Sequence, residues 1–216
     1  MNSETLKPLF ALTLQNPRAA AERVIALGLP ASVWWMLLSL TVVLSSLYMV
    51  GRFLAAPLPP ALLEELSRTP NGQQTLLLYS LFTDSPFFTT VMLFGFTVLM
   101  VHVLCWVGRA LGGQGSLLDI LSVFTLLQVM TLLLSFGLFL ISLIVPALAA
   151  LGSLVFLAWT LWAVTSFLDA AHGFNNPLKA FGVLVVSFIA VLFGASIAMG
   201  VLGGLFLGIT GGAGNV

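Results

Sequence analysis

Charged residues are scarce in this chain of 216 residues: they make up 6% of it, whereas hydrophobic residues make up 60%. An average soluble domain is about 25% charged and about 45–50% apolar. The shortage of charge therefore excludes an ordinary soluble protein. The mean hydropathy of +1.15 agrees with this conclusion and predicts a membrane protein.

An excess of basic residues is also missing, since seven Lys and Arg stand against seven Asp and Glu. No nucleic-acid partner is expected, because binding a phosphate backbone needs clustered positive charge. The one cysteine, Cys105, cannot form an intramolecular disulfide, and the two histidines form no cluster with metal-ligand spacing. We expect neither a metal nor a cofactor. Because no nucleophile, base and acid can be assembled, we expect no enzyme activity either.

Long charge-free segments are what the sequence has in plenty. A bilayer core of about 30 Å needs about 20 predominantly apolar residues in helical form. Five segments meet this requirement, and the helices expected from them are residues 31–51, 86–110, 117–144, 146–168 and 178–209. The uncharged stretch from 120 to 168 is divided at Val145-Pro146 because it is too long for one helix. We therefore expect an all-α, polytopic membrane protein in which residues 1–216 form one domain around a five-helix bundle.

Local signals mark where these helices begin. Asn16-Pro17, Ser85-Pro86 and Asn176-Pro177 each combine a side-chain acceptor for the N-cap with a proline for the first helical position. Ser116-Leu117-Leu118-Asp119 has the spacing of a capping box. Each of these signals predicts a helix start outside the apolar core of a span.

Two segments lie outside the spans. The N-terminal segment, residues 1–30, is expected to contain an interfacial helix from Asn16 to Leu29, with a short helix packed against the bundle as an equal alternative. The segment from Arg52 to Asp84 is expected to be a connection that contains one short helix. We expect it to include a turn at residues 69–72, where the sequence reads Thr-Pro-Asn-Gly.

Basic residues are distributed unequally between the two ends of the bundle. One end has Lys7, Arg18, Arg23, Arg109 and Lys179, whereas the other has only Arg52 and Arg68. The positive-inside rule then places the N-terminus in the cytoplasm and the C-terminus on the other side, which in a cell inner membrane is the periplasm. The first span is expected to be an uncleaved anchor.

Few side chains inside the spans are strongly polar. His102 and Gln128 are the main ones, and we consider them a possible intramembrane polar site that serves either structure or transport. His172, close to Asp169, is expected to be solvated or to lie among lipid head groups. Sequence alone does not decide whether His102 and Gln128 serve structure or transport.

Glycines form two patterns. Gly112, Gly113 and Gly115 make a cytoplasmic glycine loop without the lysine of a phosphate-binding loop, so we expect a turn with positive φ, or an anionic head group at the next helix. In the last span a helix-packing row recurs every four residues, beside a second row at Ala190 and Gly194. That row is Ser196, Gly200, Gly204 and Gly208. It predicts either packing within the bundle or self-association.

Two short segments accompany the five spans: Leu14-Gln15-Asn16-Pro17-Arg18, and Gly112-Gly113-Gln114-Gly115-Ser116-Leu117-Leu118-Asp119. In these features the chain resembles bacterial members of the Yip family, the Ypt/Rab-GTPase-interacting membrane proteins, over roughly its whole length. The resemblance implies a five-helix bundle, a cytoplasmic N-terminus and no catalytic residues. Eukaryotic members of the family are linked to vesicle trafficking and bind small GTPases. Their long cytosolic N-terminal region has no counterpart here. GTPase binding is therefore not expected.

Three functions follow from the sequence. The leading one is a non-enzymatic integral membrane protein that acts through association with other membrane proteins or through local organisation of the membrane. Its partners are the lipid bilayer and other integral membrane proteins or further copies of itself. The second is a small transporter or lipid-translocating protein with a path near His102 and Gln128. The third is an accessory subunit of a larger membrane complex, which would use the same helix association as the first.

Overall fold

Helices account for almost all of the regular structure. The computed structural model describes the backbone of residues 3–211 and the side chains of residues 7–197. The helices in this part of the chain are α1 (Ser3–Gln15), α2 (Pro17–Ile25), α3 (Ala31–Ala55), α4 (Pro60–Ser67), α5 (Pro70–Asp84), α6 (Pro86–Ala110), α7 (Leu117–Ile144), α8 (Pro146–His172) and α9 (Pro177–Gly211). No strand occurs within it, which confirms the predicted all-α class.

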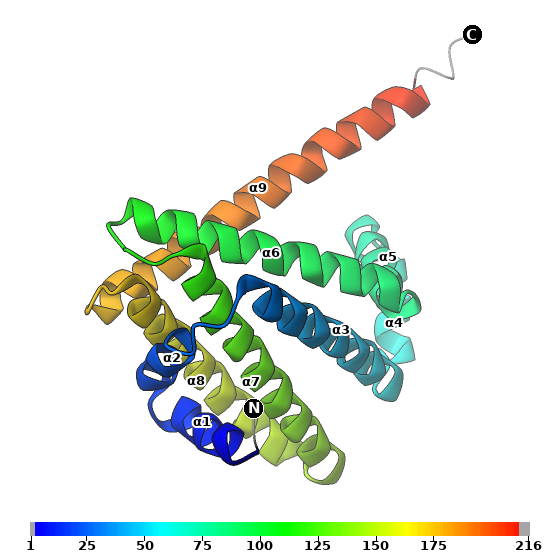
Figure 1. Ribbon diagram of the computed structural model, residues 1–216. Coiled ribbons are helices and arrows are strands. Elements are labelled where there is room, and N and C mark those ends of the chain that lie inside the picture. Colours follow the sequence, from blue (N-terminus) through cyan, green and yellow to red (C-terminus); the bar gives the residue numbers. More distant parts are fainter. Residues whose placement is uncertain (1–2, 212–216) are drawn as a thin grey trace.

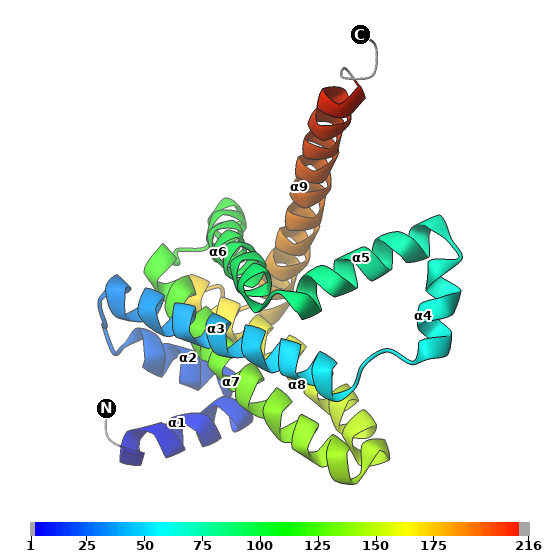
Figure 2. The ribbon, with the colours of Figure 1, turned by 90° about the vertical axis from the view of Figure 1, so that its right-hand side faces the viewer.

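Five of these helices, α3, α6, α7, α8 and α9, are long and apolar enough to cross a membrane. The helices α7 and α8 form an antiparallel hairpin, and α3 packs against both α6 and α7 (Figure 1). The first part of α9 contacts α6 and α8, and its second part extends away from the other helices (Figure 2). The prediction of a polytopic five-helix protein is confirmed.

The starts of the helices have the chemistry expected of them. Asn16 accepts a hydrogen bond from the backbone N–H of Ala19 at 3.2 Å, and Ser85 accepts one from Phe88 at 3.2 Å. At the start of α7 the hydroxyl of Ser116 accepts from the backbone of the aspartate three residues later, whose carboxylate accepts from the Ser116 N–H. These contacts satisfy N–H groups that have no partner inside the helix.

The interior of the bundle is assembled from all five long helices. Each contributes a large or branched side chain that is almost completely buried: Leu38, Leu104, Leu121, Phe167 and Val183. Many other large apolar side chains are exposed, and Trp106 and Ile144 are each more than 80% exposed. Such a surface is costly in water and favourable against lipid, so the outside of the bundle suits a bilayer.

The segment between α3 and α6 is more ordered than expected. The prediction of a turn at residues 69–72 is wrong, because Pro70 is the first residue of α5. Thr69 is the N-cap and accepts a hydrogen bond from the N–H of Gly72 at 3.0 Å. A Thr-Pro pair is a helix-start signal as well as a turn signal, and here the helix forms.

The N-terminal segment consists of two short helices that pack against the bundle. In α2 the small side chains of Ala20 and Ala21 are fully buried, and Val24 is nearly so. They allow α2 to approach α8 and α7 closely. The structure shows α2 packed on α7 and α8, and the helix ends at Ile25 rather than at Leu29. The interfacial position of this segment stays a prediction.

Candidate functional site

Polar side chains gather at the end of the bundle where α8 ends. We call Arg18, Asp169, His172 and Asn175, with the loop of residues 112–116, the α8-end cluster. The start of α2, the end of α6, the start of α7 and the start of α9 all reach this end of the bundle. The cluster therefore joins parts of the chain that are far apart in sequence.

Asp169 is the anchor of the cluster. Its side chain is only 2% exposed and forms an ion pair with the guanidinium of Arg18 from α2. Its other oxygen accepts a hydrogen bond from the backbone N–H of Asn176 at 2.9 Å. Arg18 also donates to the side chain of Asn175 and pairs with Glu22 at 3.1 Å. One buried carboxylate thus fixes both α2 and the loop after α8.

His172 is buried, so the expectation that it is solvated or lies at head-group level is wrong. Its ring stacks on Phe174 with the centroids 5.2 Å apart, and its Nε2 atom lies 3.3 Å from the accepting carbonyl oxygen of Leu104. Its Nδ1 atom is buried without a hydrogen-bond partner. The sequence places His172 beside a polar loop, and only the packing of α6 and the glycine loop covers it.

Glycines make room for the His172 ring. A Cβ atom added at Gly108 would lie 2.0 Å from Nε2 of His172, and one added at Gly113 would lie 2.6 Å from Nδ1. A Cβ at Gly115 would lie 2.6 Å from the carbonyl oxygen of Ala171. Real Cβ atoms are not found at such distances, so any side chain at these positions would displace the end of α8.

One residue of the glycine loop has a backbone conformation that favours glycine. Gly112 has a φ of 83°, in the left-handed region that favours glycine. The next part of the loop binds α8 through its backbone, because the N–H of Gln114 donates to the carbonyl oxygen of His172 at 3.0 Å. The loop is therefore a turn that is fastened to α8.

The two polar residues predicted inside the spans have separate partners. His102 is exposed on α6, where it bonds to the carbonyl oxygen of Val98 in its own helix and stacks against Trp35. Gln128 of α7 donates to the hydroxyl of Thr97 of α6 at 3.4 Å. No hydrogen bond or ring contact joins His102 to Gln128 among the side chains that the structure describes.

The predicted helix-packing row extends past the described side chains. Ser196 is exposed, and its hydroxyl bonds to the carbonyl oxygen of Leu192 within α9. Gly200, Gly204 and Gly208 lie outside the residues whose surroundings are described. At Gly194, in the neighbouring row, an added Cβ would meet no other atom within 4 Å.

The contacts of the α8-end cluster have a structural role. The carboxylate of Asp169 forms an ion pair and accepts a hydrogen bond from a backbone N–H, and the ring of His172 is packed between glycines and Phe174. In the described part of the chain, no three His, Cys, Asp or Glu side chains lie together as metal ligands would. The arrangement holds four segments of the chain at one end of the bundle.

The two segments that distinguish the sequence meet in this cluster. Arg18 ends the first segment, and Gly113 and Gly115 belong to the second. A Yip1 domain matches residues 11–208, which is nearly the whole chain. The chain belongs to the Yip1 domain family. No curated protein and no solved structure matches it.

Within this Yip1 domain, sequence reasoning missed Arg18, Asp169 and His172 as one site. A weak signal was present: Asp169 and His172 are three residues apart at the end of an apolar helix, so they lie on neighbouring positions of its surface. Arg18 stands in an alanine-rich helix that buries its small residues. Arg18 and Asp169 pair although they are 151 residues apart in the sequence. Helical spacing gives no information about contacts over such a separation.

Proposed function

We propose that this multi-pass membrane protein of the Yip1 domain family is non-enzymatic and acts by associating with other integral membrane proteins or with copies of itself. The second part of α9 is the surface that we assign to this association. We further propose a cell inner membrane location, with the α8-end cluster on the cytoplasmic side. The larger number of basic residues at that end supports this orientation.

The observation that carries the proposal is the position of α9. Its second part extends beyond the bundle, as both ribbon views show (Figures 1 and 2). Every described residue from Leu192 to Ile197 is exposed, including Phe193 and Ile197, and Gly194 and Ser196 lie among them. Small residues between large apolar ones allow a second helix to approach closely in a membrane.

The experiment compares copurification from native membranes after extraction into polymer nanodiscs. We expect the wild-type chain to copurify with a protein in fixed stoichiometry, or with a second copy of itself. Gly194→Leu and Gly200→Leu are expected to reduce this association about fivefold or more, because a bulky side chain prevents close helix contact. An added Cβ at Gly194 meets nothing within 4 Å in the monomer, so we expect the substitution to leave its folding intact.

Gly95→Leu is the matched control. Gly95 lies exposed on α6, and an added Cβ there also meets no atom within 4 Å. The control is expected to retain the partner at the wild-type level. A wild-type chain that is monomeric and carries only lipid, or a Gly194→Leu variant that keeps its partner, would contradict association through α9. The first of these results would favour local organisation of the bilayer instead.

A further inference from the structure

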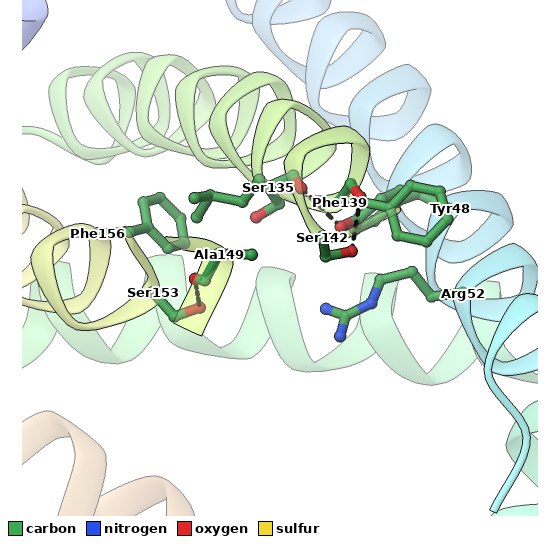
Figure 3. Close-up of a pocket in the computed structure, with 9 residues that line it drawn as sticks. Tyr48, Arg52, Ser135, Phe139, Ser142, Ala149, Ser153 and Phe156 are labelled. Carbon is green, nitrogen blue, oxygen red and sulfur yellow. Dashed lines mark hydrogen bonds between the residues drawn. The ribbon is translucent and has the colours of Figure 1, made fainter. Parts of the chain in front are cut away.

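Arg52 is a charged residue on the last turn of the apolar helix α3. Figure 3 shows its guanidinium pointing from α3 into a cavity of about 240 Å³, which also has walls from α7 and α8. An adjoining cavity of about 400 Å³ shares Tyr48 and Arg52 with it. Arg52 therefore lies between two cavities, at the end of the bundle away from the α8-end cluster.

Within residues 7–197, whose side chains the structure describes, no carboxylate pairs with Arg52. No carboxylate is found among the described residues that line the two cavities. Among the residues that the structure describes, the ion pairs are Arg18–Glu22, Arg18–Asp169 and Arg68–Glu64. A guanidinium is always charged and offers five N–H donors in a fork that fits the oxygens of a phosphate. The two cavities thus have the charge to bind an anion.

Hydroxyl groups surround the same space. Ser142 and Ser153 donate to carbonyl oxygens of their own helices, at 2.6 Å and 2.7 Å. In the view of Figure 3 the Ser142 hydroxyl lies above the Arg52 guanidinium, and the Ser153 hydroxyl lies across the cavity, in the direction in which Arg52 points. A serine hydroxyl rotates freely about its Cβ–Oγ bond, so it is able to turn from a helix carbonyl to a bound anion. Arg52 with these two serines makes a set of donors for one phosphate group.

Most of the remaining walls are apolar, although Tyr48 and Ser135 also line the first cavity. Phe139 and Phe156 line the first cavity, and Met49 and Phe53 line the second. A small hydrated anion gains little from such walls, whereas the glycerol and acyl parts of a lipid are stabilised by them. Because α3 is long enough to span a bilayer and Arg52 lies in its last turn, we place the guanidinium at the depth of lipid head groups.

We propose that the two cavities at Arg52 bind one anionic phospholipid. Its phosphate is held by the guanidinium and the hydroxyls of Ser142 and Ser153, and its apolar part lies along Phe139 and Phe156. Charge complementarity with Arg52 selects an anionic head group over a zwitterionic one. This site is separate from α9 and does not depend on the association proposed above.

The test is native mass spectrometry of the full chain, purified in detergent and incubated with phosphatidylglycerol or phosphatidylcholine. We expect the wild type to retain one phosphatidylglycerol and to prefer it over phosphatidylcholine. Arg52→Gln, which keeps much of the size and polarity of the side chain, is expected to weaken this retention about tenfold, because charge-assisted hydrogen bonds to the phosphate are lost. Arg68→Gln is the control, since it removes an exposed charge that pairs with Glu64.

A second variant changes the shape of the site and leaves its charge in place. Ser153→Leu fills part of the cavity and is expected to reduce retention of phosphatidylglycerol while Arg52 remains. Circular dichroism of each variant verifies that it is folded. Equal retention by the wild type and Arg52→Gln would overturn the proposal, as would equal retention of both lipids by the wild type. Displacement of phosphatidylglycerol by inorganic phosphate at comparable concentration would also overturn it, because the ligand would then be a free anion.

Discussion

At the scale of single residues, the Yip1 domain depends on a buried histidine and the glycines around it. His172 is enclosed because Gly108, Gly113 and Gly115 have no side chains. This packing is as tight as in a protein core. The atoms that an added Cβ would meet belong to the His172 side chain and to the backbone, and they cannot move aside as a flexible side chain would. We therefore expect substitutions at Gly113 and Gly115 to be poorly tolerated, because space is lacking there and not because of the backbone conformation.

The pair Gly108 and His172 tests this directly. The three atoms nearest to a Cβ added at Gly108 all belong to the His172 ring. We expect Gly108→Ala to lower the free energy of unfolding by about 1–3 kcal/mol, as overpacking does. In a His172→Ala background the same change is expected to cost far less, and a double-mutant cycle measured by thermal unfolding in detergent quantifies the difference.

Gly95→Ala on the same helix is the control for Gly108→Ala. Nothing lies within 4 Å of a Cβ at Gly95. Alanine is a better helix former than glycine by about 0.5–1 kcal/mol, so this variant is expected to be as stable as the wild type or more so. Additive costs for Gly108→Ala and His172→Ala would show that the ring is not enclosed as described.

At the scale of elements, the short helix α2 is the one whose position depends most on tertiary contacts. It has nine residues, too few for a stable isolated helix in water. Burial of Ala20, Ala21 and Val24 against the bundle holds one of its faces. The ion pair from Arg18 to Asp169 holds its first turn against the end of α8.

Arg18→Gln measures what this ion pair contributes. The variant leaves the carboxylate of Asp169, which is 2% exposed, without its partner. Leaving one charge buried without a partner costs about 3–5 kcal/mol in a fully buried pair, and we expect about 2–3 kcal/mol here because the Arg18 side chain is 37% exposed. Thermal unfolding in detergent gives the overall loss, and limited proteolysis is expected to show earlier cleavage near α2.

Glu22→Gln is the matched control on the same helix. It removes the other partner of Arg18, but the Glu22 side chain is 57% exposed. Exposed pairs contribute about 0–1 kcal/mol, so this variant is expected to remain close to the wild type. Equal losses from Arg18→Gln and Glu22→Gln would contradict the assignment of Asp169 as the anchor.

At the scale of the whole molecule, the two ends of the bundle differ in character. The α8-end cluster closes one end with polar contacts that are largely buried, whereas α4 and α5 extend from the other end beyond α3 and α6 (Figure 2). Five spans place these two ends on opposite sides of a membrane. The distribution of basic residues then predicts which side is the cytoplasm.

Cysteine labelling tests this orientation. Cys105 is the one native cysteine and is buried, so Cys105→Ala provides a background without thiols. Gln74 on α5 and Gln114 in the glycine loop are both exposed and lie at opposite ends of the bundle. In intact cells a membrane-impermeant maleimide is expected to label Gln74→Cys, and to label Gln114→Cys only after the membrane is opened. The reverse pattern would invert the proposed topology.

The spans were predictable because the relevant information is local. A charge-free apolar run of about 20 residues predicts a spanning helix from its own composition, and the caps at Asn16, Ser85 and Ser116 depend on neighbours within three residues. The bounds of α6 and α7 coincide with the expected ranges for the same reason. The start of α5 was mistaken for a turn because Thr69-Pro70 fits both structures, and local sequence does not choose between them.

By itself, the sequence determined that this protein is a five-span helical membrane protein, because composition and the length of apolar runs leave no other way to satisfy the backbone in lipid. The tertiary structure alone decided which polar residues matter. His102 and Gln128 stood out in sequence but found separate partners, whereas Arg18 and Asp169 met across 151 positions. Likewise, Arg52 faces a cavity that exists only where α3, α7 and α8 come together. Such pairings depend on how the helices pack against one another. Packing involves the surfaces of several helices at once, so the sequence of one segment does not reveal it.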